Sequence, residues 1–391
     1  MLDPVPPPPA WLQTLIRPFT EYASLPSLQY HIHEVLGAFV FYQLVQSVIS
    51  PIVSSWLFPN IYPKFPRRTK LNWDVHVVSL VQSTIINTVA LWVMFVDEER
   101  KSMNAGERVF GYSGASALIQ ALATGYFLWD LIVSTVHVRV FGLGLWFHAV
   151  SALWVFGLGF RPFVNFYSPV FILYELSSPF LNFHWFFDKV NMTGSRAQWY
   201  NGMILLSVFF SCRLLWGTYQ SVQVFRDIFK ALGQTRASST LRAPFDIHTM
   251  IFQARNATLC VEESCIKAND EISKFAHHQQ SGIPLWLVFT YLGSNLVLNS
   301  LNFYWFSKMI EAVMKRFRDT ADDRAKRELT PQVMEKEAEA MILQAAATLE
   351  EEERIFINGR MKDDESEDQK YGTAASSGTQ KKGPSARRRK A

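Results

Sequence analysis

A long apolar stretch, from residue 125 to residue 188, constrains this chain more than any other feature. It is rich in aromatic residues and is long enough for about three membrane crossings of roughly 20 residues each. An ionisable side chain in hydrocarbon costs on the order of 2.5–3.5 kcal/mol, so such residues normally face the interior of a helix bundle and mark a site. We therefore expect the function to lie among the ionisable residues set in this stretch, which include Asp130, His137, His148, Glu175 and His184.

The rest of the chain contains further apolar runs of the same kind. Hydrophobic residues make up 49% of the 391 residues, and the charged residues concentrate after Phe225. The sequence therefore predicts an all-α, polytopic transmembrane helix bundle. It has six or seven crossings, because the fifth segment can form either one crossing or two half-helices. The predicted segments are residues 35–58, 75–96, 113–138, 140–160, 162–187, 197–225 and 283–306.

The composition changes at both ends of this region. The first residues carry an acid and a run of prolines, and they lack the basic region of a signal peptide. The stretch after Phe317 is rich in Ala, Glu, Leu and Lys, which favour helix, whereas the last residues are Gly, Ser, Lys and Arg. The predicted parts are a disordered Pro-rich N-terminus (1–34), a transmembrane domain (35–317) with a polar loop (about 227–282), a charged helix (318–358) and a disordered basic tail (359–391).

The basic residues of the connections predict the orientation. The loop after the first segment is the most basic of the short loops, and the region after the seventh segment is also basic. Basic loops remain in the cytosol, so with seven crossings we expect a cytosolic C-terminus. The polar loop is then luminal, where Asn256 is a glycosylation site and Cys260 and Cys265 can form a disulfide. No other ligand is grouped with these cysteines, so we predict no metal site.

Arg213 stands in the middle of the sixth segment. A guanidinium at this depth needs an acid or backbone carbonyls around it. Asp130 and Glu175 are the available acids, so we predict that Arg213 pairs with one of them. His137 follows Asp130 by seven residues, which places both on one helix face. This spacing suits a site, and a structural ion pair between Asp130 and Arg213 is the alternative.

His148 and Glu175 have polar neighbours at helical spacing. Ser151 follows His148 by three residues, and an imidazole can act as a general base near neutral pH. A buried histidine that only forms hydrogen bonds is the alternative. Ser178 and Asn182 follow Glu175 by three and seven residues, and the proline between them frees the carbonyl of Glu175. We expect this broken helix to line a cavity for a lipid head group, the alternative being a proline kink in a packed helix.

Four motifs occur together, namely GYFLWDL, FHAVSAL, YELSSPFLNFHWFF and NGMILLSVFFSCRLLW. In combination they resemble the TLC-domain family of endoplasmic reticulum membrane proteins. This family includes the ceramide synthases, the translocating-chain-associating proteins and small lipid-linked proteins. The stretches FVFYQLVQSVISPIVSSWLF and LNWDVHVVSLVQS are similar to the branch of TLC domain-containing protein 4. The resemblance covers about residues 35–317, and it implies a multi-pass protein of the endoplasmic reticulum that handles lipid.

The ceramide synthases of this family transfer an acyl group from acyl-CoA to a sphingoid amine. They carry an HHxxT motif and a distal HDxxDxxLE element. Here His148 matches the first histidine, but Ala149 and Ala152 stand at the second histidine and the threonine. Only His148 and Glu175 remain as catalytic candidates, whereas acyl transfer needs a base and support for an oxyanion. The resemblance therefore argues for the TLC fold and for a role that involves lipid, and against the ceramide synthase reaction.

The predicted function is non-enzymatic: binding or regulation of a sphingolipid or phospholipid, in membrane lipid homeostasis. One alternative is a divergent N-acyltransferase that uses acyl-CoA, with His148 and Glu175 as catalytic residues. Another is a cargo or translocon-associated factor. We predict no cofactor and no nucleic-acid partner, since the basic tail is short and lacks interleaved aromatic residues. The predicted lipid cavity is lined by Asp130, His137, His148, Ser151, Glu175, Ser178, Asn182, His184 and Arg213.

Overall fold

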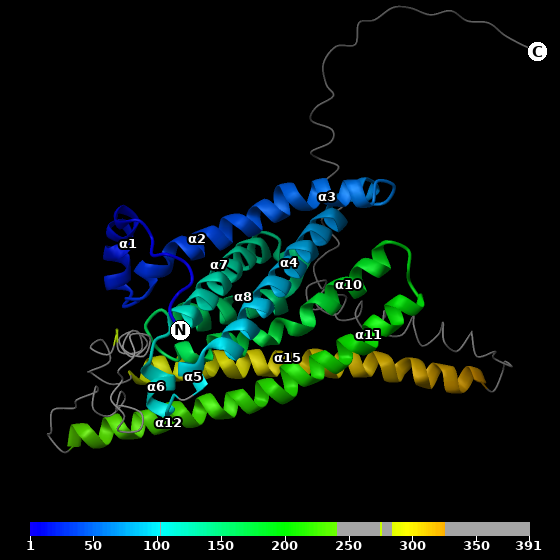
Figure 1. The fold of residues 1–391 in the computed structure, drawn as a ribbon. Coiled ribbons are helices and arrows are strands. Elements are labelled where there is room, and N and C mark those ends of the chain that lie inside the picture. The colour runs from blue at the N-terminus through cyan, green and yellow to red at the C-terminus, as the bar shows by residue number, and fades with distance from the viewer. Residues whose placement is uncertain (102, 241–273, 276–283, 325–391) are drawn as a thin grey trace, which may run out of the picture.

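The computed structural model describes the chain except for residues 102, 241–273, 276–283 and 325–391 (Figure 1). Every regular element in the described part is a helix, which confirms the predicted fold class. Most are α-helices, η1 and η5 are π-helices, and η2, η3 and η4 are 3-10 helices. The elements are α1 (Ala10–Tyr22), α2 (Leu28–Leu44), η1 (Val45–Ile49), α3 (Ser50–Leu57), η2 (Tyr62–Lys64), α4 (Arg67–Val96), α5 (Glu98–Lys101), α6 (Ala105–Phe110), α7 (Gly114–Val136), α8 (Val138–Leu158), η3 (Asn165–Tyr167), α9 (Ser168–Phe171), η4 (Ile172–Ser177), α10 (Ser178–Lys189), α11 (Arg196–Phe209), η5 (Phe210–Trp216), α12 (Gly217–Thr240) and α15 (Leu285–Arg324).

Five helical stretches among the described residues are long and apolar enough to cross a membrane. They correspond to the first, second, third, fourth and sixth of the predicted segments. A chain with several such stretches and no described strand is a polytopic helical membrane protein. The five stretches are Leu28–Leu57, Arg67–Val96, Ala105–Val136, Val138–Leu158 and Arg196–Gly233.

The predicted fifth segment does not form one continuous helix. Val164 adopts a left-handed backbone with φ of 54°, and the chain then passes through four short helical elements. Pro169 and Pro179 stand in the first turns of α9 and α10. Proline starts a helix readily but cannot continue one, because it lacks the amide hydrogen. The break leaves the 3-10 helix η4, which carries Glu175, packed against α4, α11 and η5.

The predicted seventh segment forms the first half of α15, a helix of 40 residues that is not among the five candidate spans. Helix α15 packs on α8, η5 and α12. In Figure 1, α12 and α15 run side by side at the lower edge of the bundle. Asn299 Nδ2 donates a hydrogen bond to Ser221 Oγ of α12 at 2.8 Å. At least one asparagine of this segment therefore joins two helices.

Helix α7 occupies the centre of the bundle and packs against α2, α4 and α8. Gly125 permits the close approach of α2, because a Cβ at this position would lie 2.4 Å from the carbonyl oxygen of Val35. Small residues commonly allow such close packing between membrane helices. The contact fixes α7 in place, and with it the two polar residues that follow, Tyr126 and Asp130.

The N-terminal 34 residues, predicted to be disordered, contain α1 and the start of α2. After the proline run, apolar residues at helical spacing form α1, whose Leu12 and Ile16 pack on α2. Ser27 Oγ donates to the carbonyl oxygen of Phe160 at 2.8 Å and ties this part to the bundle. Large apolar side chains on the outer face of an amphipathic helix are typical of a membrane surface. Such exposed side chains in α1 are Trp11, Leu15, Phe19 and Tyr22.

The structure continues a helix past residue 227, the predicted start of the polar loop. Helix α12 continues to Thr240, because Val224, Ile228 and Ala231 recur at helical spacing and are buried. Other predictions lie outside the described residues. They concern Asn256, the pair Cys260 and Cys265, most of the charged helix 318–358 and the tail 359–391.

Candidate functional site

A cavity of about 260 Å³ lies inside the bundle. It is enclosed by α4, α7, α8, η4, α10, α11, η5 and α15. More of its wall is apolar than polar, as is usual for sites that bind small molecules. The polar groups come from segments far apart in the sequence. They are Asn72, His76, Ser79, Tyr126, Asp130, Ser134, His148, Glu175, Ser177, Ser178, Asn182 and Arg213.

Arg213 and Glu175 form an ion pair at the wall of this cavity, which confirms one of the two predicted pairings. Arg213 Nη2 lies 3.6 Å from Glu175 Oε1. The guanidinium also donates to Ser177 Oγ at 2.9 Å, Ser178 Oγ at 3.2 Å and Asn302 Oδ1 at 3.1 Å. Arg213 stands on the π-helix η5, a type of local widening that often occurs at functional sites. Both charges are therefore held in fixed positions.

A second group of hydrogen bonds links α4 to α10. His76 Nδ1 and Asn182 Oδ1 are 2.7 Å apart, and Asn182 Nδ2 donates to Ser79 Oγ at 3.0 Å. The His76 ring stacks on Trp185, with centroids 4.2 Å apart. These contacts fix the orientation of an imidazole and an amide at the cavity wall.

Asp130 and His148 differ from the other carboxylate, imidazole and guanidinium groups of the cavity, because neither forms a hydrogen bond with another described residue. The His148 ring lies near two aromatic rings, with centroids 6.1 Å from Phe127 and 5.8 Å from Trp305. Both side chains line the cavity. Asp130 is within electrostatic range of Glu175, and His148 is within range of Glu175 and Arg213. Polar groups inside a protein are normally paired. The carboxylate of Asp130 and the imidazole of His148 are therefore available to form hydrogen bonds with a ligand in the cavity.

The family model of the TLC domain matches this chain over residues 72–311. The chain belongs to the TLC-domain family. An uncharacterised TLC domain-containing protein of Schizosaccharomyces pombe is 32% identical over 309 residues, which cover 79% of this chain and 87% of that protein. Topoisomerase I damage affected protein 4 of Saccharomyces cerevisiae is 28% identical over 312 residues, 77% of this chain and 92% of its own length.

Human TLC domain-containing protein 4 is 29% identical over 168 residues, which cover 41% of this chain and 62% of the human protein. No solved structure matches the chain. All cavity-lining residues, from Asn72 to Met309, fall within the matched range of the TLC domain. Helices α1, α2 and α3 lie before it. The cavity is therefore built entirely from the part of the chain that matches the family.

The TLC domain brings six of the nine predicted cavity residues to one place, and these are Asp130, His148, Glu175, Ser178, Asn182 and Arg213. The other three do not line the cavity. His137 lies between α7 and α8, because α7 ends at Val136 and the spacing from Asp130 no longer applies. Ser151 is buried elsewhere in α8. His184 follows Asn182 by two residues, which places it on another side of α10.

Sequence reasoning missed six polar residues of the TLC-domain cavity, which are Asn72, His76, Ser79, Tyr126, Ser134 and Ser177. The sequence did contain an indication for His76, because it is the one ionisable residue in the predicted second segment, 75–96. The rule that intramembrane ionisable residues mark sites applied to it as well. The sequence contained no such indication for Ser79 and Tyr126, because serine and tyrosine are ordinary residues in membrane helices.

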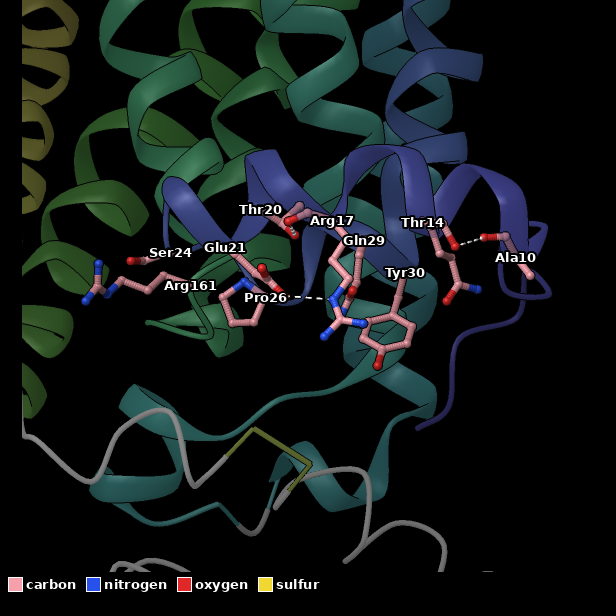
Figure 2. A pocket seen from close by; sticks show the side chains of 11 residues that line it. Ala10, Thr14, Arg17, Thr20, Glu21, Ser24, Pro26, Gln29, Tyr30 and Arg161 are labelled. Carbon is pink, nitrogen blue, oxygen red and sulfur yellow. Dashed lines mark hydrogen bonds and ion pairs between the residues drawn. The ribbon is translucent and has the colours of Figure 1, made fainter.

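A wider hollow of about 700 Å³ lies between α1 and the start of α2 (Figure 2). It is larger than the TLC-domain cavity, but its charged groups are near water. Arg17 Nε pairs with Glu21 Oε1 at 2.7 Å, and the two side chains are 68% and 64% exposed. Figure 2 shows this pair on the rim of the hollow. We therefore place the functional site in the smaller cavity, where Asp130 and His148 have no hydrogen-bond partner among the described residues.

Proposed function

We propose that this TLC-domain protein binds the head group of a membrane lipid in the cavity and acts in lipid homeostasis of the endoplasmic reticulum membrane. The observation that carries the proposal is the pair Asp130 and His148. Both line a cavity inside a bundle of apolar helices, and neither has a hydrogen-bond partner among the described residues. In a membrane the molecules that bring polar groups to such a depth are lipids.

The chemistry of the cavity favours a ligand with both donors and acceptors. Asp130 accepts hydrogen bonds, Arg213 donates them, and the imidazole of His148 can do either. A sphingoid head group offers an amine and hydroxyls, and a phospholipid offers a phosphate. An amine next to Asp130 or a phosphate next to Arg213 gains a charge-assisted hydrogen bond. Either class fits the charges present.

The size of the cavity indicates how much of the lipid it holds. Its volume of about 260 Å³ lies just below the range of about 300–1,000 Å³ that is usual for drug-sized ligands. A head group fits this space, and the acyl chains must lie outside it. Leu181 of α10 lines the cavity and is 36% exposed, so the wall is thin there. We infer that the chains leave past Leu181 into the bilayer.

Mass spectrometry of lipid that co-purifies with the protein tests the proposal. We expect a stoichiometric lipid in the wild type and a marked loss of it in His148→Ala. His137→Ala is the matched control, because it removes the same ring from a position outside the lining. A wild type without bound lipid, or equal lipid in both histidine variants, would contradict the proposal.

A second function has one specific observation in its favour. His148 and Glu175, the two catalytic candidates, line the same cavity. In a divergent N-acyltransferase the lipid amine attacks the thioester carbonyl of acyl-CoA, an amide bond forms and the carbon–sulfur bond breaks. His148 would take the amine proton and pass it to the leaving thiolate. Acyl-CoA turnover with a sphingoid base, abolished in His148→Ala, would establish this function in place of simple binding.

The location and orientation are part of the proposal. We propose an endoplasmic reticulum membrane protein with a cytosolic C-terminus, supported by its family and by the basic loops. A glycosylation tag fused to the C-terminus is expected to remain unmodified. Addition of sugar to that tag would place the C-terminus in the lumen.

A further inference from the structure

Three ligand-type side chains meet where the N-terminal segment reaches the first turns of α2. This place lies outside the cavity and outside the range that matches the TLC domain. The donor atoms of Asp3, His31 and Glu34 all lie within 4.8 Å of one another. His31 Nδ1 is 3.2 Å from Asp3 Oδ2 and 2.8 Å from Glu34 Oε2. We propose that Asp3, His31 and Glu34 bind a divalent transition-metal ion, and that this ion is zinc.

Burying these three side chains costs free energy unless a further cation balances their charge. The His31 side chain is 1% exposed and that of Glu34 is 3% exposed. Glu34 Oε1 is buried and accepts no hydrogen bond from a described residue. A buried carboxylate needs compensation, and one imidazole cannot balance two carboxylates. A divalent cation balances both and gives the remaining oxygen of Glu34 a place in its coordination sphere.

The distances require little change to accept zinc. Zinc binds imidazole nitrogen at about 2.0–2.1 Å and carboxylate oxygen at about 2.0–2.2 Å, so neighbouring ligands of a tetrahedral ion are about 3.3 Å apart. The two separations from His31 Nδ1, 3.2 and 2.8 Å, approach this value. Calcium and magnesium prefer oxygen ligands alone, whereas imidazole favours the later transition metals. The donor set therefore suits zinc better than calcium or magnesium.

The second ring nitrogen of His31 is held in the way that is usual for a metal ligand. His31 Nε2 lies 2.5 Å from the hydroxyl of Tyr112, which is itself buried. Such an outer partner fixes the ring so that the opposite nitrogen faces the metal. Here the opposite nitrogen, Nδ1, faces both carboxylates.

His33 offers a fourth ligand. Its Nε2 lies 3.7 Å from Glu34 Oε1. The ring has a polar contact with the backbone of Pro6, yet neither ring nitrogen makes a hydrogen bond of ordinary geometry among the described residues. Structural zinc sites usually have four ligands, so this side chain or a water molecule would have to supply the fourth.

The proposed ion would tie three parts of the chain together. Asp3 belongs to the N-terminal segment, His31 and Glu34 belong to α2, and Tyr112 stands just before α7. In Figure 1 the N-terminal end lies beside the start of α7, at the same end of the bundle. Zinc at this point would fasten the N-terminal segment to the bundle. Its binding energy would then contribute to folding.

Metal titration of the full chain tests this site. The protein is purified through a tag without histidine, stripped with a chelator and titrated with zinc chloride. We expect one zinc per chain by elemental mass spectrometry and a rise in melting temperature on zinc addition. Cobalt(II) substitution should produce the visible absorption bands of a tetrahedral site, which an ion pair cannot produce.

Variants separate a metal site from a simple ion pair. Glu34→Gln and Asp3→Asn should each lower zinc affinity at least tenfold, whereas His137→Ala should bind as the wild type does. Asp3 is the less buried carboxylate, with 19% of its side chain exposed, so Asp3→Asn remains informative if Glu34→Gln fails to fold. Tyr112→Phe should retain one zinc with about 10- to 100-fold weaker affinity. A wild type that binds no zinc, or an Asp3→Asn variant that binds it equally well, would leave only an ion pair.

Discussion

Two groups of buried charges in this bundle differ in how completely their hydrogen bonds are satisfied. The first, here the Asp227 cluster, consists of Arg108, Tyr167 and Asp227. Arg108 donates to both carboxylate oxygens of Asp227, at 2.5 and 2.8 Å, and the Tyr167 hydroxyl donates to Oδ2 at 2.7 Å. Burial and the bond to Asp227 raise the pKa of Tyr167, so its hydroxyl remains a donor. This cluster joins α6, η3 and α12, and both oxygens of Asp227 accept hydrogen bonds within it.

The second group, here the cavity cluster, consists of Asp130, His148, Glu175 and Arg213. Glu175 and Arg213 are paired and hydrogen-bonded, much as in the Asp227 cluster. Asp130 and His148 stand beside them without hydrogen bonds to described residues. The comparison shows that a buried charge alone does not identify a site. The useful signal is a polar group that faces a cavity and that the protein leaves unpaired.

Arg213→Ala should have the largest effect on stability. The substitution removes one partner of a buried ion pair and three further hydrogen bonds. Breaking such a pair costs about 3–5 kcal/mol, because the remaining charge stays buried. Thermal unfolding in detergent should show a large drop in melting temperature. Arg17→Ala is the control, since it breaks an exposed ion pair and should leave the melting temperature unchanged. A small effect of Arg213→Ala would mean that water reaches Glu175.

Asp227→Ala should have a smaller effect that is confined to stability. Hydrogen bonds to charged groups contribute about 1.5–3 kcal/mol, and the Arg108 side chain, 29% exposed, can turn to water after the loss. The same thermal measurement should therefore show a moderate drop. Lipid that co-purifies should be unchanged relative to the wild type. A loss of lipid at equal folded yield would contradict the division between the two clusters.

Tyr167→Phe sharpens the comparison further, because it removes one hydrogen bond and keeps the ring. We expect a loss of about 1 kcal/mol in the free energy of unfolding, since Asp227 keeps both bonds from Arg108. The measurement is again the melting temperature in detergent. A loss as large as that of Asp227→Ala would show that Tyr167, and not Arg108, carries the cluster.

The part of the fold that could be predicted from the sequence followed from its composition. Uncharged apolar runs long enough to span a bilayer indicated helices at 35–58 and 75–96, and the structure has the corresponding stretches Leu28–Leu57 and Arg67–Val96. The fifth segment, 162–187, was equally apolar, yet it is broken. Pro169, Pro179 and the left-handed Val164 act through local backbone geometry, which a hydropathy pattern does not register.

The pairing of Arg213 was the part of the site that could be predicted from the sequence, because few acidic partners were available to it. Arg213 needed an acid, few acids were available, and Glu175 supplies one. His76 and Tyr126 could not be assigned in this way, because their place at the cavity results from the packing of α4 and α7 against η4 and α10. The cluster around His31 was missed for a different reason. All three of its members, Asp3, His31 and Glu34, lie within residues 1–34, which were predicted to be disordered.

Asp130→Asn should have the smallest effect on stability and still alter binding. The substitution removes a charge that has no hydrogen-bond partner among the described residues, so folding loses no interaction and the cost of burying that charge disappears. We expect a melting temperature equal to or slightly above that of the wild type. A lipid with an amine should lose its charge-assisted bond and co-purify less, whereas a phosphate-bearing lipid should be retained or bound more tightly, because a like charge has been removed from the cavity. The direction of the change in bound lipid therefore distinguishes the two lipid classes. A clear loss of stability would show instead that Asp130 has a structural partner, and that the cavity cluster is as complete as the Asp227 cluster.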